Sequence, residues 1–415
     1  MTAPTHNLAI NSRRLWDAIH ETAAFGGTPK GGVKRLTLSD EDKQVRDWFR
    51  AACEAIGCTV AVDEMGVMYA RRPGRRNDLP PIALGSHLDT QPTGGKFDGV
   101  LGVLGGLEAL RTLHDAGYET NAPIELVNWT NEEGARFAPA MLASGVFAGA
   151  LEKEFALSRA DRQGALFGEE LDRIGYRGDE PCGARKFSAF FELHIEQGPI
   201  LEAEGKTVGV VTGVQGIRWF EVTLTGQDAH TGSTPMNLRR NALLGAARLI
   251  EKVDAIAKAR PPAVGTVGLI ESRPNSRNVI PGEVFFTVDF RHVDDAVLDE
   301  MEAEFFDAVE EVSRELKLEA DARRDWMSAP VAFDEACVAA VREAAENAGH
   351  GWREIVSGPG HDAAYVARVA PTSMIFVPCK DGISHNEAES STEAECAAGA
   401  QTLLDAVLIY DRRFA

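Results

Sequence analysis

The chain has 415 residues, with 43 Lys and Arg against 63 Asp and Glu, so its formal charge at pH 7 is −20. An acidic surface repels phosphate backbones, which argues against general nucleic-acid binding, and no apolar run reaches the roughly 18 residues of a membrane span. The composition, 44% hydrophobic and 26% charged residues, is typical of a globular protein with two or three domains.

The N-terminus and the cysteines both predict a cytoplasmic location. The first residues, MTAPTHNLAINSRRLW, lack the apolar stretch of a signal peptide. The six cysteines, at positions 53, 58, 182, 337, 379 and 396, are scattered and form no CxxC pair. We therefore expect reduced thiols and not disulfides or a zinc knuckle.

The first part of the chain alternates helical and strand-like segments. Apolar spacing predicts helices over 9–24, 39–56 and 99–116. Short apolar runs predict strands over 59–62, 68–71, 81–86 and 124–129. This alternation favours an α/β fold with a mostly parallel sheet flanked by helices. In such folds, ligands bind beyond the carboxyl ends of the strands.

Residues 217–325 differ in character. They predict strands over 217–225, 264–271, 284–290 and 318–323. One helix is expected to begin at Thr234 and Pro235, which suit the N-cap and first turn, and another after Asp294 or Asp295. The resulting βαββαβ order is the ferredoxin-like arrangement.

The last part of the chain returns to the first pattern. A helix is predicted over 337–348, a strand over 374–377 and a closing helix over 392–412. We therefore expect a catalytic domain of residues 1–212 plus 332–415, with a ferredoxin-like α+β domain of residues 213–331 inserted into it.

Histidines and carboxylates follow the predicted strands, where a parallel sheet would bring them together. They are His87, Asp89, Asp98, Glu132, Glu133, His194 and His385. Imidazole and carboxylate ligands suit Zn, Mn, Co or Ni better than Ca or Mg. Five ligands from this set would be more than one open tetrahedral site needs. Five ligands would fit two ions bridged by one carboxylate.

Each residue alone also has an ordinary structural explanation. A histidine after a strand is usually a hydrogen-bonded structural residue, and Asp98 could simply cap a helix. Glu132 and Glu133 could be a solvated pair, although one could bind metal while the other, with a raised pKa, acts as a general base. GPGHDA at 358–363 matches a nucleotide-binding pattern, but Pro359 removes a backbone donor. Together the residues favour a metal-dependent hydrolase.

Several segments give the chain a resemblance to a known family. They are HLDT at 87–90, GGKFDG at 94–99, NEEG at 131–134, HIEQGP at 194–199, GQDAHTGSTPM at 226–236, NVIPG at 278–282, DFRH at 289–292, GHDA at 360–363 and SHNE at 384–387. From about residue 10 to its end, the sequence resembles the amidase, hydantoinase/carbamoylase branch of the M20 dinuclear metallohydrolases. HIEQGP is the most specific segment, because M20 peptidases have a carboxylate where His194 stands.

The resemblance implies a bimetallic site with two divalent ions per subunit (Zn, Mn, Co or Ni). Asp98 would bridge the ions. His87 and His194 would complete one site, and Glu133 and His385 the other. Glu132 would be the general base and Asp89 would orient His87.

The resemblance also implies which residues bind substrate: Gln197, Gln215, His230, Asn278 and Arg291. His230 would act in catalysis by donating to the developing oxyanion, and the planar guanidinium of Arg291 suits an α-carboxylate. The alternatives are a loop-capping role for His230 and an ion pair of Arg291 with Asp289 or Asp294.

The resemblance implies an amidohydrolase that cleaves the linear C–N amide bond of N-carbamoyl-L-amino acids, giving the L-amino acid, CO2 and ammonia. Allantoate and β-ureidopropionate are alternative substrates, since each also presents a carboxylate and a carbamoyl group. An M20 dipeptidase and a metal-binding protein without turnover are less favoured. The inserted domain would be a lid and dimerisation surface. We therefore expect a homodimer that binds a small ureido carboxylate and has no nucleic-acid or membrane partner.

Overall fold

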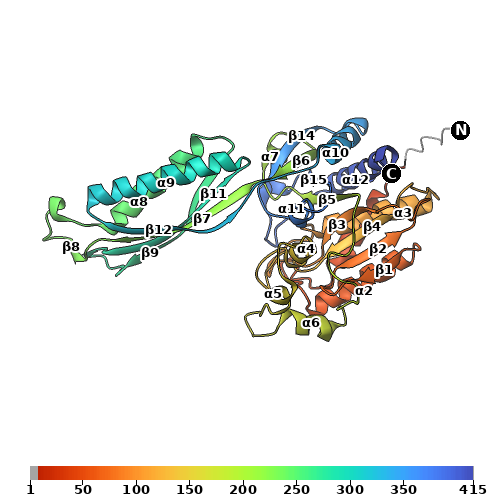
Figure 1. The fold of residues 1–415 in the computed structure, drawn as a ribbon, viewed down its shortest axis with the longest axis horizontal. Coiled ribbons are helices and arrows are strands. Elements are labelled where there is room, and N and C mark those ends of the chain that lie inside the picture. Colours follow the sequence, from red (N-terminus) through yellow and green to blue (C-terminus); the bar gives the residue numbers. More distant parts are fainter. Residues whose placement is uncertain (1–7, 415) are drawn as a thin grey trace. The chain divides into compact units, whose positions relative to one another are not determined.

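The computed structural model describes residues 8–414, which form two compact units (Figure 1). Among the described residues, unit 1 runs up to Thr212 and continues from Phe333, and unit 2 is Gly213–Ala332. Among the described residues, no helix is both long enough and apolar enough to cross a membrane.

Four parallel strands form the centre of the sheet in unit 1. In spatial order they are β4 (Ile124–Trp129), β3 (Ile82–His87), β5 (Ala189–Ile195) and β15 (Thr372–Val377). All of their residues are buried, as expected for parallel strands that are covered on both faces. The predicted α/β class with a parallel sheet is therefore confirmed.

Further strands extend this centre on both sides. Next to β4 lie β2 (Met68–Arg72) and β1 (Thr59–Val62), both in antiparallel pairs. Next to β15 lies the antiparallel β6 (Val208–Val214), which pairs with β13 (Val331–Ala332) and β14 (Trp352–Ser357). The sheet is thus parallel at its centre, and β1, β2, β6 and β13 join it through antiparallel pairs.

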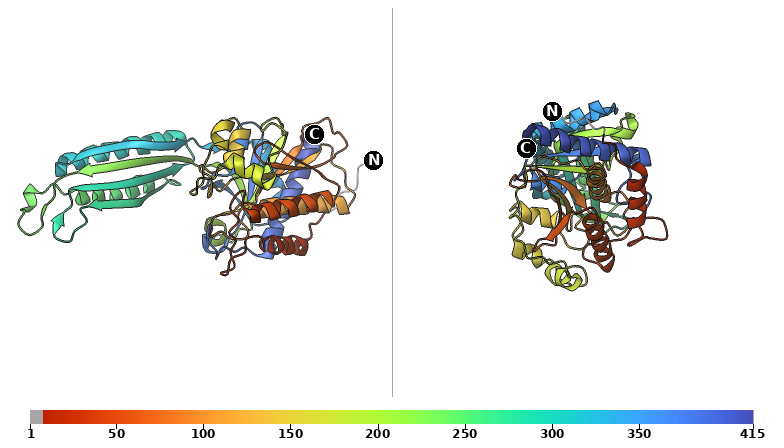
Figure 2. Two further views of the ribbon diagram at one scale, coloured as in Figure 1. Left: turned by 90° about the horizontal axis from the view of Figure 1, so that it is seen from below. Right: turned by 90° about the vertical axis from the view of Figure 1, so that its right-hand side faces the viewer.

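Helices cover both faces of this sheet (Figure 2). Leu193 of β5 packs against Gly105 of α3 (Val100–Asp115) and Gly399 of α12 (Glu393–Phe414). The side chain of the adjacent Glu192 points to the other face, where it accepts a hydrogen bond from Ala363 N in α11 (Asp362–Val366). The other helices of unit 1 are α1 (Ser12–Thr22), α2 (Asp40–Glu54), α4 (Leu142–Phe147), α5 (Lys153–Leu157), α6 (Phe167–Ile174), α7 (Ile200–Ala203), α10 (Glu335–Asn347) and the 3-10 turn η2 (Lys380–Gly382).

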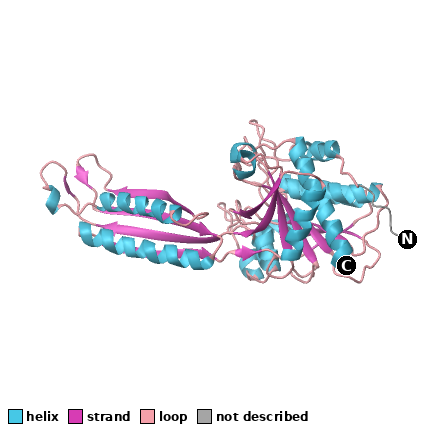
Figure 3. Ribbon diagram, turned by 90° about the horizontal axis from the view of Figure 1, so that it is seen from above, coloured by secondary structure: helices cyan, strands magenta, loops and turns pink. Residues whose placement is uncertain are grey.

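Unit 2 contains a four-stranded antiparallel sheet with helices on one face (Figure 3). Its strand order is β12 (Glu319–Ser328), β7 (Gly216–Thr225), β11 (Glu283–His292) and β9 (Val264–Arg273). Burial alternates along β7 and β11, so that one face packs on α8 (Ala242–Lys258) and α9 (Asp295–Leu316). The order of these elements along the chain is the predicted βαββαβ. A short ribbon, β8 (Ala229–His230) with β10 (Val279–Ile280), lies outside this sheet.

The start of α8 differs from the prediction. Pro235 has an extended ψ of 147°, and only a 3-10 turn, η1 (Met236–Leu238), follows it. The helix begins at Ala242, because the side chain of Asn241 accepts hydrogen bonds from two free amides of the first turn. The expectation that Thr234 is the N-cap was therefore wrong.

Candidate metal centre

The carboxyl ends of β3, β4, β5 and β15 lie at one edge of the sheet in unit 1. His87 ends β3, Glu132 and Glu133 follow β4, His194 lies near the end of β5, and His385 follows β15. Asp98 stands in the loop between β3 and α3. The parallel centre of the sheet thus explains why residues from five distant segments meet.

Asp98 lies between two groups of possible ligands. Its Oδ1 is 3.6 Å from His87 Nε2 and 3.2 Å from His194 Nε2. Its Oδ2 is 3.5 Å from His385 Nε2, which is 3.3 Å from Glu133 Oε2. Each group of three could hold a metal ion. One carboxylate that faces two donor groups with different oxygens has the geometry of a bridging ligand.

The two buried histidines present the nitrogen that a metal requires. Nδ1 of His87 is 2.9 Å from the carbonyl oxygen of Asp89, and Nδ1 of His194 is 2.9 Å from that of Ile195. A carbonyl oxygen only accepts, so Nδ1 carries a hydrogen, and in the neutral imidazole Nε2 is the nitrogen with the free lone pair. Nε2 of His87 is buried and has no hydrogen-bond partner among the described residues. An orphaned imidazole nitrogen beside a buried carboxylate fits a divalent ion.

The charges around Asp98 favour its ionised form. Burial would raise the pKa of Asp98, but His194, His87 and His385 hold it well below its ordinary value. Burial lowers the pKa of His87. For His194 burial acts in the same direction, yet Asp98 raises the pKa of this imidazole to about 9. The centre therefore contains a carboxylate that stays anionic and is available to a cation.

Asp98 does not cap α3. The N-cap residue is Gly99, at φ 65°, and no side chain caps the helix there. A Cβ on residue 99 would overlap the imidazole of His87. Glycine is therefore required at this position for both its backbone conformation and the close approach of His87.

Glu132 and Glu133 have different surroundings. Glu133 accepts hydrogen bonds from the backbone and side-chain amides of Gln91, at 3.1 and 2.7 Å. Oε2 of Glu132 lies 3.5 Å from His87 Nε2. Burial, together with the charges of Asp362 and Glu133, raises the pKa of Glu132 well above its usual range. A carboxylate of this kind at the edge of a metal site is suited to accept a proton from water.

Asp89 connects two of the loops. Its carbonyl oxygen orients His87, while its carboxylate accepts hydrogen bonds from Thr37 Oγ1 at 2.6 Å and from the amides of Glu132 and Glu133 at 3.3 Å. The side chain of Asp89 therefore holds the loop that carries the two glutamates.

The possible metal ligands His87, Asp98, Glu133, His194 and His385 are called the ligand set below. Three further residues contact it. Gln197 Nε2 and Ser384 Oγ donate to Asp98 Oδ2, at 2.8 and 2.7 Å. Glu389, which the sequence did not single out, accepts hydrogen bonds from the amides of Phe97 and Asp98. Glu389 lies four residues beyond His385 in SHNEAE, but nothing in that spacing indicates a contact with Asp98.

His361 packs against the ligand set from the other side of His194. The centres of the two rings are 4.5 Å apart, and Nε2 of His361 is buried without a hydrogen-bond partner among the described residues. Together with Glu192, the two histidines form a third group that could hold a cation.

The other expected substrate residues lie in unit 2. Gln215 has a buried Oε1 without a partner in the described structure. Nδ1 of the exposed His230 accepts from Gly232 N at 3.0 Å. The carbonyl oxygen of Asn278 accepts from Thr231 N at 3.2 Å. Both of these hydrogen bonds are made within unit 2.

Arg291 is engaged in an ion pair in this structure. Its Nε lies 3.1 Å from Asp289 Oδ1, and its Nη2 lies 2.8 Å from Oδ2. This contact is one of the alternatives that the sequence left open for Arg291. Binding of a substrate carboxylate would require Arg291 to exchange or share this partner.

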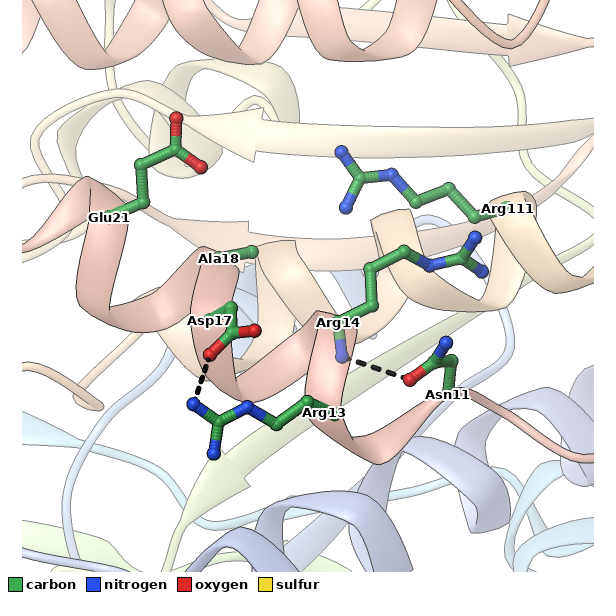
Figure 4. A pocket seen from close by; sticks show the side chains of 7 residues that line it. All are labelled: Asn11, Arg13, Arg14, Asp17, Ala18, Glu21 and Arg111. Carbon is green, nitrogen blue, oxygen red and sulfur yellow. Dashed lines mark hydrogen bonds and ion pairs between the residues drawn. The ribbon is translucent and has the colours of Figure 1, made fainter.

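Two surface grooves flank unit 1. One, of about 380 Å³, is lined by residues next to His385, including Asn386 and Glu387, and by Lys30. The other, of about 410 Å³, lies between α1 and α3 (Figure 4). In the second groove Arg13 pairs with Asp17 and Arg14 pairs with Glu108 and Asp115, and no histidine or cysteine lines it. Of these two grooves, the first lies beside His385.

Comparison with known proteins gives consistent matches over most of the chain. Residues 83–409 match the peptidase family M20/M25/M40. Over 409 residues the chain is 54% identical to an N-carbamoyl-L-amino-acid amidohydrolase of Rhizobium meliloti, covering 98% of each chain. It is 35% identical over 404 residues to the allantoate amidohydrolase of Escherichia coli strain K12, covering 95% of this chain and 97% of that protein. A solved amidase of the hydantoinase/carbamoylase family from Burkholderia multivorans is 58% identical, with 97% of this chain and 98% of that chain covered and a TM-score of 0.96.

Proposed function

Because the chain belongs to the peptidase family M20/M25/M40, within its hydantoinase/carbamoylase amidases, we propose that it hydrolyses N-carbamoyl-L-amino acids. The reaction cleaves a linear C–N amide bond and yields the L-amino acid, CO2 and ammonia. The observation that carries the proposal is the position of Asp98 between two histidine-bearing donor groups, with the buried Glu132 beside them.

The donor set fits two divalent ions, such as Zn, Mn, Co or Ni. His87, His194 and one oxygen of Asp98 would hold the first, and Glu133, His385 and the other oxygen of Asp98 the second. When bound, the ions would polarise the carbamoyl carbonyl and lower the pKa of water.

Glu132 would act as the general base. It would take a proton from the attacking water and deliver it to the leaving nitrogen. Burial raises the pKa of Glu132 above its usual range, which supports this role because it makes the carboxylate a stronger base than an exposed glutamate.

The substrate-binding roles rest on family likeness. Gln197, which already contacts Asp98, would bind substrate beside the metals. We further propose that Gln215, His230, Asn278 and Arg291 of unit 2 bind substrate. His230 would donate to the oxyanion, and Arg291 would bind the α-carboxylate through its two parallel N–H donors.

The experiment is a substrate panel after metal reconstitution. The protein is incubated with Zn, Mn, Co or Ni, and ammonia release is measured from N-carbamoyl-L-methionine, its D-enantiomer, allantoate and N-carbamoyl-β-alanine. We expect the highest kcat/KM with N-carbamoyl-L-methionine. Release from allantoate alone would overturn the substrate ranking and favour the second candidate, which the 35% identity to an allantoate amidohydrolase supports. If the protein releases ammonia from none of these compounds and hydrolyses a dipeptide instead, it would be assigned as a dipeptidase.

We also propose a cytoplasmic homodimer that associates through unit 2. The six cysteines are all free, which is typical of a reducing compartment. Exposed apolar side chains on unit 2 include Trp219 and Trp326, whose ring centres are 5.0 Å apart, and such apolar surface favours protein contacts. Light scattering after size exclusion should give twice the chain mass, and a monomer at micromolar concentration would contradict the proposal.

A further inference from the structure

The side chain of Glu389 lies directly behind Asp98. Glu389 is 5% exposed and belongs to neither group of possible ligands. Its Oε1 accepts hydrogen bonds from the backbone amides of Phe97 and Asp98, at 2.9 and 3.1 Å. These bonds join residues 292 and 291 positions apart in the sequence, so Glu389 ties the segment after β15 to the segment before α3.

A second set of contacts links Glu389 to the carboxylate of Asp98. Ser384 Oγ is 3.3 Å from Glu389 Oε2 and 2.7 Å from Asp98 Oδ2. The single hydroxyl hydrogen of Ser384 is donated to the nearer Asp98 Oδ2. Glu389 therefore holds the backbone of Asp98 directly and lies beside the serine that donates to its carboxylate.

The loop before Asp98 is shaped around Glu389. A Cβ on Gly95 would overlap the carboxylate of Glu389, so only glycine allows this approach. No side chain caps the N-terminus of α3. The contact with Glu389 therefore helps to fix the position of Asp98 in the loop before this helix.

We propose that Glu389 is a positioning residue that fixes Asp98 as the bridging ligand, acting through the backbone amides of Phe97 and Asp98. The inference rests on the proposed function, since it assumes that Asp98 bridges two ions. A bridging carboxylate must keep each oxygen directed at a different ion, and hydrogen bonds to the groups around a ligand supply that orientation.

The test compares the metal affinity of Glu389 variants by chelator competition with Zn and Mn. We expect Glu389→Ala to bind metal about 10- to 100-fold more weakly. Glu389→Gln should retain most of the affinity, because its amide oxygen can still accept from Phe97 and Asp98. Ser384→Ala should show an intermediate loss, because it removes one donor to Asp98 Oδ2.

Asp411 provides a matched control. This residue of α12 is 1% exposed and accepts hydrogen bonds from the amides of Asn121 and Ala122, at 2.9 and 2.8 Å. Asp411→Ala thus removes an equivalent buried carboxylate away from the ligand set. It should lower the Tm of the metal-free protein and leave the metal affinity and the metal-induced rise in Tm unchanged.

The outcomes are distinct. Wild-type affinity in Glu389→Ala, or an equal loss of affinity in Asp411→Ala, would overturn the positioning role. If Glu389→Ala does not fold, unchanged affinity in Gly95→Ala, whose new Cβ would displace the Glu389 carboxylate, would overturn it. Metal binding is measured without substrate, so failure of the wild-type protein to release ammonia from carbamoyl amino acids would count against the proposed function alone.

Discussion

Glu132 and Glu133 show how neighbouring residues of one type can have different chemistry. The carboxylate of Glu133 is held by Gln91 and faces His385, whereas that of Glu132 lies near His87 among other buried acids. A residue held by donors and facing an imidazole suits a ligand. Burial raises the pKa of both carboxyl groups, so the contacts and not the pKa shifts distinguish the proposed base Glu132 from the proposed ligand Glu133.

The first prediction separates these two roles. Glu132→Gln should lower kcat by about 10²- to 10⁴-fold, because it removes the proton acceptor, while the bound metal, measured by elemental analysis, stays at the wild-type level. Glu133→Gln should lower the metal content as well, because it replaces a charged ligand. A Glu132→Gln variant with wild-type kcat would exclude Glu132 as the base.

The sequence predicts that the possible metal ligands lie together, but it does not indicate which residues hold them in position. His87, Glu133, His194 and His385 each follow an apolar run, so the sheet alone implies that they meet. Glu389 contacts Asp98 across nearly three hundred positions, and a contact of that kind leaves no local pattern. The sequence therefore predicts which side chains could bind metal but not which side chain holds Asp98 in place.

At the scale of elements, continuous apolar runs were the most informative signal. The central parallel strands are buried on both faces, so their sequences are apolar without alternation. The start of α8 was harder to predict, because the segment from Ala229 to Thr234 is engaged elsewhere. Val279 pairs with His230, and Thr231 N donates to Asn278 O, which prevents a helix from beginning at Thr234.

The second prediction concerns the start of α3. Gly99→Ala should weaken metal binding, because the new Cβ overlaps the His87 imidazole. Gly117, just beyond the end of α3, is the matched control. It has a similar positive φ of 59° but open space around it. Gly117→Ala should lose about 1–2 kcal/mol of stability through backbone strain. Gly99→Ala should lose more, because its Cβ also overlaps His87, and only Gly99→Ala should lose metal affinity. Equal metal affinities for the two variants would contradict this account of Gly99.

The third prediction concerns the turn between β1 and β2. Asp63 is 1% exposed and accepts hydrogen bonds from Met65 N, Val67 N and Tyr69 Oη, yet burial raises its pKa to about 6. The folded state therefore binds more protons than the unfolded state between about pH 4 and 6, so Asp63 lowers the free energy of unfolding as pH rises through that range. The expected loss is about 2–3 kcal/mol.

Asp63→Asn tests this effect, because asparagine does not titrate. Urea unfolding at pH 4 to 7 should show a wild-type stability that falls relative to the variant as pH increases. A difference between the two proteins that stays constant with pH would show that the pKa of Asp63 is not raised.

At the scale of the whole molecule, the ligand set and the other expected substrate residues lie in different units. His87, Asp98, Glu133, His194 and His385 belong to unit 1, and Arg291 belongs to unit 2. The proposed role of Arg291 can therefore be tested by variants that leave the residues of the ligand set unchanged.

The last prediction uses Arg291 and its partner Asp289. If Arg291 binds the substrate carboxylate, Arg291→Lys should raise KM by about 10- to 100-fold, because lysine is a point charge without the bidentate geometry, and metal content should not change. Asp289→Asn weakens the ion pair but leaves the guanidinium, so KM should stay near the wild-type value or fall. If the ion pair serves only to stabilise β11, both variants would instead lower Tm alike and leave KM unchanged. That result would remove Arg291 from the substrate site while leaving the metal centre and its reaction untouched.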